Sequence, residues 1–268
     1  MDDRQFRRII ETFGLSWHGY RKVRKAVKKR IARHMQELNC RSVTHYLSVI
    51  ESNRRLRAQS QRLLNVSISR FFRDREFWRA LERSLFPEIC RARKNSVRIW
   101  SAGCARGEEP YSIAIAWDVF AKRSELHCQL DLWATDTNPE WLSKAKAGVY
   151  ARSSLKDMEP EVLETYFEPL PGASEYRVSH FVKKEIIWKM HDLATDDPPT
   201  RDVSVLFLRN NLLTYYNETI RKTVLEKTLE SLASPGFLII GSHERIPEEV
   251  RSLEPSAFHR LIFRKAHR

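Results

Sequence analysis

The residues that could do chemistry gather around one turn that contains glycines. Gly103 and Gly107 follow a β-branched and aromatic run that starts at Val97, and an apolar-periodic segment follows them. This order of strand, glycine loop and helix is typical of nucleotide-type binding folds, where glycines let a ligand approach the backbone. On its own, a loop with two glycines fits a plain strand-to-helix turn equally well.

Acidic residues near this turn indicate the charge of a ligand. Glu108 and Glu109 stand where the helix begins, and there they would repel a pyrophosphate. S-adenosylmethionine (AdoMet), with its sulfonium and ammonium groups, fits better. Asp136 ends the next β-rich run, roughly 30 residues past the loop, where a carboxylate can accept hydrogen bonds from both ribose hydroxyls. Spacing alone also allows Asp136 to be an ordinary helix N-cap.

The string SAGCARGEEPYSIA, residues 101–114, resembles the first motif of the CheR family, the AdoMet-dependent protein-glutamate methyltransferases of bacterial chemotaxis. The FFR string at 71–73 and the RNNLLTYY string at 209–216 resemble two further motifs. The resemblance extends from about residue 4 to 245. It implies an α/β fold: a Rossmann-like AdoMet methyltransferase domain with a mixed sheet and a small antiparallel β-subdomain, preceded by an all-α N-terminal domain.

The same resemblance implies the residues of the site. Arg73 would pair with the incoming carboxylate, and Tyr215 would place a hydroxyl near the methyl donor; these two are the expected catalytic residues. The cofactor-binding positions that it implies are Ser67, Ser69, Arg73, Ala102, Gly103, Gly107, Glu109, Asp136, Asp192, Leu193, Asn211 and Tyr215. The cofactor is AdoMet, with S-adenosylhomocysteine as product. No metal-ligand spacing occurs, and none is needed.

Three positions depart from the family pattern. Ser67 replaces an asparagine, and Pro169 stands where the family has an arginine. In the gapless alignment that matches Asn211 and Tyr215 to family residues, Asn210 replaces an arginine. These departures keep an alternative open, in which the chain is a catalytically degenerate AdoMet sensor or docking module.

Basic residues are concentrated in the first third of the chain. Residues 1–90 hold 21 Lys and Arg against 9 Asp and Glu, which accounts for +12 of the overall net charge of +13. The segment 20–38 has helical periodicity, and its cations resemble the basic CheR helix that meets receptor helices. The docking residues that this implies are Arg21, Arg24, Lys25, Lys28 and Lys29. The expected partner is an acidic helical, chemoreceptor-like protein, although a charge run can also be a solvated face.

Nucleic acid is the weaker alternative partner for this basic region. The sequence DPPT at 197–200 looks like the loop of amino-methylating enzymes but lacks its aromatic residue and precedes the strand. We therefore interpret it as a loop. Methylation of nucleic acid remains an alternative function, disfavoured by this pattern, and methylation of another protein is a further alternative.

Composition sets the remaining expectations. A domain boundary near residue 92 would separate a basic helical domain, 1–92, from an AdoMet-dependent domain, 93–268, with a β-subdomain at about 170–190. The four cysteines are scattered and predict reduced thiols. No apolar run approaches the ~18 residues of a membrane span, and the start lacks the apolar core of a secretory signal. We expect a cytoplasmic monomer without membrane insertion.

Overall fold

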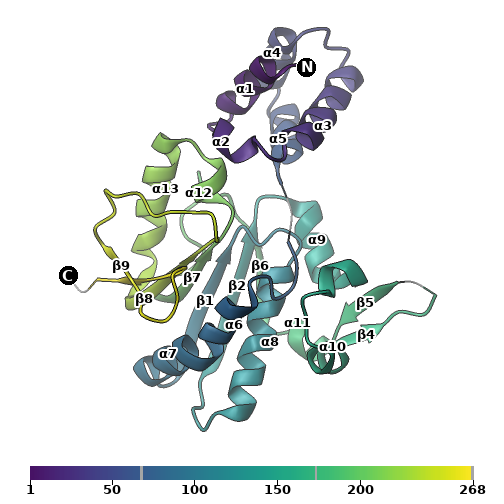
Figure 1. The fold of residues 1–268 in the computed structure, drawn as a ribbon. Coiled ribbons are helices and arrows are strands. Elements are labelled where there is room, and N and C mark those ends of the chain that lie inside the picture. Colours follow the sequence, from purple (N-terminus) through teal and green to yellow (C-terminus); the bar gives the residue numbers. More distant parts are fainter. Residues whose placement is uncertain (67–68, 173, 267–268) are drawn as a thin grey trace. The chain divides into compact units, whose positions relative to one another are not determined.

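The computed structural model describes residues 1–66, 69–172 and 174–266 and divides into two compact units (Figure 1). Unit 1 comprises 1–67 and 211–225, and unit 2 comprises 68–210 and 226–268. The boundary expected near residue 92 lies inside unit 2, and the division into 1–92 and 93–268 stays a prediction. Among the described residues, no helix has the length and apolar character needed to cross a membrane.

Unit 1 is helical. Its N-terminal helices are α1 (Asp3–Thr12), α2 (Trp17–Tyr20), α3 (Arg24–Glu37), α4 (Val43–Glu51) and α5 (Arg54–Leu64). Phe6, Ile9 and Ile10 of α1 are fully buried, which confirms the helical spacing read from the sequence. Asp2 forms a capping box with Gln5 at the start of α1, so the helix begins where its backbone N–H groups find partners.

A segment from the C-terminal half of the chain completes unit 1. It contains α12 (Leu212–Tyr215) and the first part of α13 (Glu218–Glu230). The backbone N–H of Ser16 donates to the Tyr215 carbonyl oxygen at 2.7 Å, and that of Asn217 donates to Gly14 at 2.9 Å. The Tyr215 and Tyr20 rings meet edge to face, with centroids 5.2 Å apart. Tyr215 therefore packs against the N-terminal helices.

Unit 2 is built on a seven-stranded sheet of order β6-β2-β1-β7-β8-β10-β9. The strands are β1 (Ser96–Ala102), β2 (Gln129–Asp136), β6 (Ile186–Met190), β7 (Val203–Leu208), β8 (Leu232–Ile240), β9 (Leu253–Pro255) and β10 (Ile262–Lys265). Strands β6, β2, β1, β7 and β8 pair in parallel, while β10 pairs antiparallel with β8 and β9. The predicted mixed sheet is confirmed.

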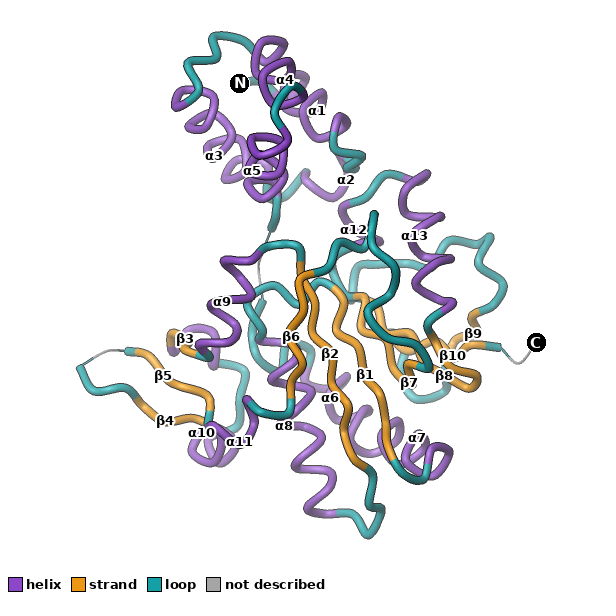
Figure 2. The backbone as a smooth tube through the Cα atoms, turned by 180° about the vertical axis from the view of Figure 1, so that it is seen from behind, coloured by secondary structure: helices purple, strands orange, loops and turns teal. Residues whose placement is uncertain are grey.

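Helices precede the first strand of this sheet in the chain and also connect its strands. Before β1 come α6 (Arg75–Ala80), the π-helical turn η1 (Leu81–Leu85) and α7 (Phe86–Arg93). Between β1 and β2 lies α8 (Glu108–Arg123), and α9 (Pro139–Ala147) follows β2. Figures 1 and 2, seen from opposite sides, show α6, α7 and α8 on one face of the sheet. Because α8 is apolar along this face, with Ile113, Ile115 and Ala116 at 0% exposure, it packs firmly there.

A small antiparallel sheet branches off between β2 and β6. Its order is β3-β5-β4, from β3 (Val149–Ala151), β5 (Glu175–Val178) and β4 (Phe167–Pro169). The turn η2 (Arg152–Leu155) and the helices α10 (Pro160–Tyr166) and α11 (His180–Lys183) accompany it. The predicted small sheet exists, but it begins at Val149, and Ile186–Met190 belongs to the large sheet instead.

Two of the four cysteines are bonded. Cys90 of α7 and Cys128, just before β2, form a disulfide with an S–S distance of 2.07 Å, whereas Cys40 and Cys104 are free and buried. The prediction of four reduced thiols is wrong for this pair. The fold places the two Cα atoms 5.9 Å apart, a proximity that a sequence separation of 38 residues does not reveal.

Candidate active site

The predicted glycine loop connects the end of β1 to the start of α8. Gly103 and Gly107 have φ angles of +81° and +93°, which favour glycine. The backbone N–H groups of Gly103 and Cys104 both donate to the Thr135 carbonyl oxygen of β2, each at 2.8 Å. The loop is thus held against the end of the neighbouring parallel strand, where such folds bind their ligands.

Gly107 is required by packing as well as by its backbone conformation. A Cβ atom at this position would lie 2.9 Å from Ala145 Cβ, from Trp188 Cη2 and from Tyr150 Oη. The Tyr150 hydroxyl donates to the carbonyl oxygen of Arg106 at 2.6 Å, which holds the ring against the loop. Packing around the loop therefore requires a glycine at position 107, whether or not a ligand approaches the backbone there.

Asp136 ends β2 and reaches the glycine loop. Its carboxylate accepts hydrogen bonds from the backbone N–H groups of Ala105 and Asn138, each at 2.9 Å. The residue is 7% exposed; burial raises the pKa of its carboxyl, and the backbone hydrogen bonds oppose the rise. The backbone N–H of Thr137 also acts on this carboxylate; since a carboxylate has about four acceptor positions, Asp136 retains capacity for a hydroxyl donor such as that of a ribose.

A second carboxylate lies at the same edge of the sheet, after β6. The backbone N–H of His191 donates to the Asp136 carbonyl oxygen at 3.1 Å, which places the following segment beside Asp136. The Asp192 carboxylate accepts from the backbone N–H of Ala194 at 2.9 Å, and its charge adds to the raised pKa of Asp136. Leu193 is buried.

Glu109 belongs to a buried ion-pair network that the sequence does not predict. Arg209, directly after β7, has a side chain 5% exposed; its Nη1 lies 3.5 Å from a Glu109 carboxylate oxygen. Its Nη2 donates to Asp74 at 2.7 Å. The Ser101 hydroxyl of β1 donates to the second Glu109 oxygen at 2.8 Å. Burial raises the pKa of Glu109, and the charge of Arg209 opposes that rise.

Arg73 lies in a segment that this network fixes. The residues on either side, Phe72 and Asp74, have left-handed backbones with φ of +49° and +68°. The Trp78 indole N–H donates to the Arg73 carbonyl oxygen at 2.8 Å, while Asp74 pairs with Arg209. Such strained backbone persists only where its surroundings hold it, and here they hold the backbone of Arg73.

The departure at Asn210 has a local explanation. Its φ is +53°, a left-handed conformation that asparagine tolerates better than most side chains. Its backbone N–H donates to the Glu244 carboxylate at 2.8 Å, and so does that of Gly241 at 2.7 Å. The charged side chain at this place is that of the neighbouring residue, Arg209, which is buried within unit 2. The only signal for it in the sequence is a cation that ends the apolar run 203–208.

The predicted site residues fall in both units. Those that unit 2 brings to one end of its sheet are Ala102, Gly103, Gly107, Glu109, Asp136, Asp192 and Leu193. Ser69 and Arg73 also belong to unit 2, whereas Asn211 and Tyr215 belong to unit 1. Ser67 lies outside the described residues. The roles assigned to all these residues stay predictions.

The predicted docking helix 20–38 forms in part as α3, which begins at Arg24; Tyr20 ends α2, and Arg21 lies in the turn between the two helices. Asp3 of α1 pairs with Lys28 at 2.8 Å and with Arg24 at 3.3 Å, and these cations lower the pKa of its carboxyl. Two of the predicted docking cations therefore have an acidic partner from another helix. The remaining three, which are exposed, are Arg21, Lys25 and Lys29.

An open mixed sheet with a glycine loop after β1 and an acidic residue at the end of β2 defines a Rossmann-like domain of the methyltransferase kind. Residues 67–261 match the family model described as CheR methyltransferase, SAM binding domain. The chain therefore belongs to the CheR family of AdoMet-dependent methyltransferases.

Relatives of this chain carry names from the same family. It is 32% identical to a chemotaxis protein methyltransferase of Listeria monocytogenes, over 69% of this chain and 67% of the relative. It is 26% identical to chemotaxis protein methyltransferase 1 of Pseudomonas aeruginosa, over 82% and 81%. It is also 28% identical to an uncharacterized 104.1 kDa protein of Rhodobacter capsulatus, where it covers 82% of this chain and only 23% of the relative.

The residues at the loop fit AdoMet. Glu109, Asp136 and Asp192 supply carboxylates at one end of the sheet, and the Glu108 Oε2 atom is buried without a hydrogen-bond partner in the described structure. This donor set attracts a sulfonium or an ammonium group and repels a pyrophosphate. The cofactor expected from the family is therefore consistent with the charges that the fold assembles.

Proposed function

We propose that this protein transfers the methyl group of AdoMet to glutamate side chains of acidic, helical segments of chemoreceptor-like proteins. The observation that carries the proposal is membership of the CheR family over 67–261, together with a carboxylate-lined loop built by β1, β2 and α8. The chemotaxis methyltransferases named above support the choice of substrate.

The chain's own residues have three tasks on this proposal. Asp136 accepts a hydrogen bond from a ribose hydroxyl with the acceptor capacity that the backbone N–H groups leave. The glycine loop and the buried Leu193 enclose the adenosyl part, and Asp192 accepts a hydrogen bond from the adenine amino group. The remaining members of the proposed cofactor set are Ser67, Ser69, Arg73, Ala102, Glu109, Asn211 and Tyr215.

Catalysis on this proposal is positioning. AdoMet, when bound, supplies a methyl group on a sulfonium that an oxygen nucleophile displaces in line. A glutamate is ionised at neutral pH, so no residue of this chain has to remove a proton. Arg73 orients the incoming carboxylate by charge and hydrogen bonding, and Tyr215 contributes a hydroxyl. Holding two reactants in such geometry can contribute roughly 7–11 kcal/mol.

Docking of the substrate rests on α3 and on the turn before it, which holds Arg21. The exposed cations Arg21, Lys25 and Lys29 present positive charge to an acidic helix, with Arg24 and Lys28 shared with Asp3. Charge complementarity of this kind steers association more than it adds affinity. Two further expectations, a cytoplasmic location and a monomeric state, stay predictions.

The test is methyl transfer from tritiated AdoMet to a purified receptor signalling fragment. We expect alkali-labile label on the fragment, as a glutamyl methyl ester requires. The Arg73→Ala and Tyr215→Phe variants should lose transfer while retaining S-adenosylhomocysteine binding, and the exposed Arg91→Ala variant on α7 should behave as wild type. Binding without transfer to any acidic helix would instead identify a sensor or docking module, and label on RNA or DNA would identify a nucleic-acid methyltransferase.

A second arm tests the docking surface. Reversing the charges of Lys25 and Lys29 to glutamate should raise KM for the fragment and leave kcat nearly unchanged, because on this proposal these residues bind the substrate and take no part in the transfer step. Arg54→Glu, an exposed charge reversal at the start of α5, is the matched control. Equal KM in both variants would exclude α3 as the docking helix.

A further inference from the structure

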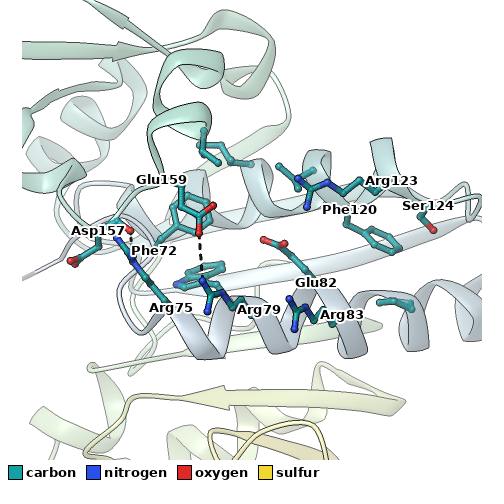
Figure 3. Close-up of a pocket in the computed structure, with 15 residues that line it drawn as sticks. Phe72, Arg75, Arg79, Glu82, Arg83, Phe120, Arg123, Ser124, Asp157 and Glu159 are labelled. Carbon is teal, nitrogen blue, oxygen red and sulfur yellow. Dashed lines mark hydrogen bonds and ion pairs between the residues drawn. The ribbon is translucent and has the colours of Figure 1, made fainter.

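A groove of about 720 Å³ opens in unit 2 between the α6–η1 segment and α8 (Figure 3). Its residues on α8 are Ile115, at the middle of the helix, and Val119, Phe120 and Arg123 in the second half. With a rise of about 1.5 Å per residue, Phe120 lies about 18 Å along α8 from Glu108 at the glycine loop. The groove is therefore a separate site, and its volume is in the range of small-molecule pockets.

The inner wall of this groove is aromatic and aliphatic. Trp78 and Phe120 line it while being only 3% and 7% exposed, and Ile115 is fully buried beneath them. The Phe72 and Trp78 rings meet edge to face, with centroids 5.3 Å apart. A wall with several aromatic rings suits a planar ring of a ligand.

The outer rim of the groove is charged, with arginines from both walls. Arg79 lies 3.6 Å from Glu159, and Arg75 donates to the Asp157 carbonyl oxygen at 2.9 Å; Figure 3 draws both contacts as dashed lines. The Asp157 carboxylate in turn pairs with Arg70 at 3.0 Å. These contacts occupy the end of the groove nearest the segment 157–162.

The other end of the rim holds two arginines with spare hydrogen-bonding capacity. Within the described parts of the chain, Arg83 and Arg123 make no ion pair within 4 Å and no side-chain hydrogen bond. Figure 3 shows the Glu82 carboxylate between them. Burial raises the pKa of Glu82, and both arginines oppose the rise. Two guanidinium groups facing one half-buried carboxyl leave an excess of positive charge for an anion.

The groove wall also holds the segment that carries Arg73. The Trp78 indole N–H donates to the Arg73 carbonyl oxygen at 2.8 Å, and the Phe72 backbone N–H donates to the Ser112 hydroxyl at 3.1 Å. A ligand that stacks on Phe72 or Trp78 would therefore press on residues bonded to or next to Arg73.

We propose that this groove binds a nucleotide, whose phosphate accepts hydrogen bonds from Arg83 and Arg123 on the exposed side of Glu82 and whose base lies against Phe72, Trp78 and Phe120. Glu82 accepts an N–H or O–H of the same ligand, which explains a carboxylate on an otherwise cationic rim. Guanidinium forks match phosphate oxygens, and aromatic faces match a base. On the proposed function, a nucleotide bound in the groove also changes the rate of methyl transfer, because it contacts Trp78, which is hydrogen-bonded to Arg73.

The first test is calorimetric titration of GMP into the full-length protein saturated with S-adenosylhomocysteine, which blocks the cofactor site. We expect GMP to bind at least about ten-fold more tightly than guanosine or inorganic phosphate, because only GMP uses both halves of the groove. Arg83→Gln and Arg123→Gln should each weaken GMP binding by about ten-fold or more. Arg91→Gln on α7 is the matched control, and equal unfolding midpoints show that the variants fold.

Four results would overturn the proposal: no GMP binding at millimolar concentration, binding by both variants as tight as by wild type, loss of binding with S-adenosylhomocysteine, or binding of an acidic peptide instead of GMP. The coupling to Arg73 is tested by the methyl-transfer rate with and without GMP; an unchanged rate in wild type refutes that part. Because calorimetry needs no methyl transfer, GMP binding by an inactive protein would leave the groove assigned while refuting the proposed function.

Discussion

The Arg209→Met substitution should lower the stability of the protein, because it removes the cation of the buried network behind the glycine loop. Arg209 bonds Asp74 at 2.7 Å, lies 3.5 Å from Glu109 and has its guanidinium 4.7 Å from the centroid of the Phe77 ring. Methionine keeps the aliphatic contact and removes the charge. Removing one partner of a buried pair costs about 3–5 kcal/mol. Because the Asp74 side chain is 32% exposed and that of Glu109 16%, we expect the lower end, about 3 kcal/mol.

The assay is urea unfolding of unit 2, followed by near-ultraviolet signals of its tryptophans, with Arg91→Met as control. Most of the loss should come from leaving Glu109 buried without a counter-charge. Adding Glu109→Gln to Arg209→Met should therefore recover part of the stability, and the double-mutant cycle should give a coupling of about 1–3 kcal/mol. The difference in the free energy of unfolding between the variant and wild type should also decrease as pH falls, because protonation of Glu109 removes the unpaired charge.

Two results would refute this reasoning. A loss of unfolding free energy below about 1 kcal/mol would show that the Arg209 ion pairs contribute no more than pairs on a protein surface do. Additive effects of Arg209→Met and Glu109→Gln would show that the two side chains do not interact. The first result would also remove the reason for treating the Arg73 segment as fixed through Asp74.

Three further predictions concern the loop and its surroundings. Gly107→Ala, at a left-handed position where a Cβ meets three atoms at 2.9 Å, should lower the urea midpoint and weaken S-adenosylhomocysteine binding; an unchanged midpoint would contradict the packing. Asp136→Asn should weaken S-adenosylhomocysteine binding by about 1.5–3 kcal/mol, the range for hydrogen bonds to a charged group, measured by calorimetry; equal affinity would exclude ribose binding. Burial lowers the pKa of His191, so the unfolded chain takes up its proton first, and stability should fall as pH drops below about 6.5. His191→Asn should lose less stability over that range, and equal slopes in urea unfolding would refute this.

The fold and the loop were predictable because local patterns carry them. Gly103 and Gly107 mark left-handed backbone positions, the run 130–136 alternates as a strand, and the periodicity of 20–38 predicts α3. Each of these signals depends on residues close together in the chain, where periodicity and backbone preference act directly. The motif around Gly107 lies where a predicted strand ends and a predicted helix begins. The sequence order of strand, loop and helix therefore predicts that the loop lies at the carboxyl end of its strand.

The network and the unit boundaries were not predictable because they join residues far apart in the chain. Asp74, Glu109 and Arg209 come from three elements, and nothing in their spacing shows that they meet. The same holds for Tyr215, which packs on Tyr20, and for the Cys90–Cys128 disulfide. The sequence marks Gly107 as a special position, but it does not show that three side chains distant in sequence leave no room for a Cβ atom there.

The network changes how the acidic loop should attract a cation. The sequence suggests that Glu108 and Glu109 act together at the start of α8, but Arg209 neutralises much of the Glu109 charge, and Ser101 takes one of its oxygens. Asp136 and Asp192 make no ion pair in the described structure. Electrostatic attraction for the sulfonium and ammonium groups should therefore come mainly from the Asp136 and Asp192 carboxylates, while Glu109 orders the start of α8. Accordingly, Glu109 contributes to the site first as a support for Arg209, and the carboxylates at the ends of β2 and β6 determine its charge.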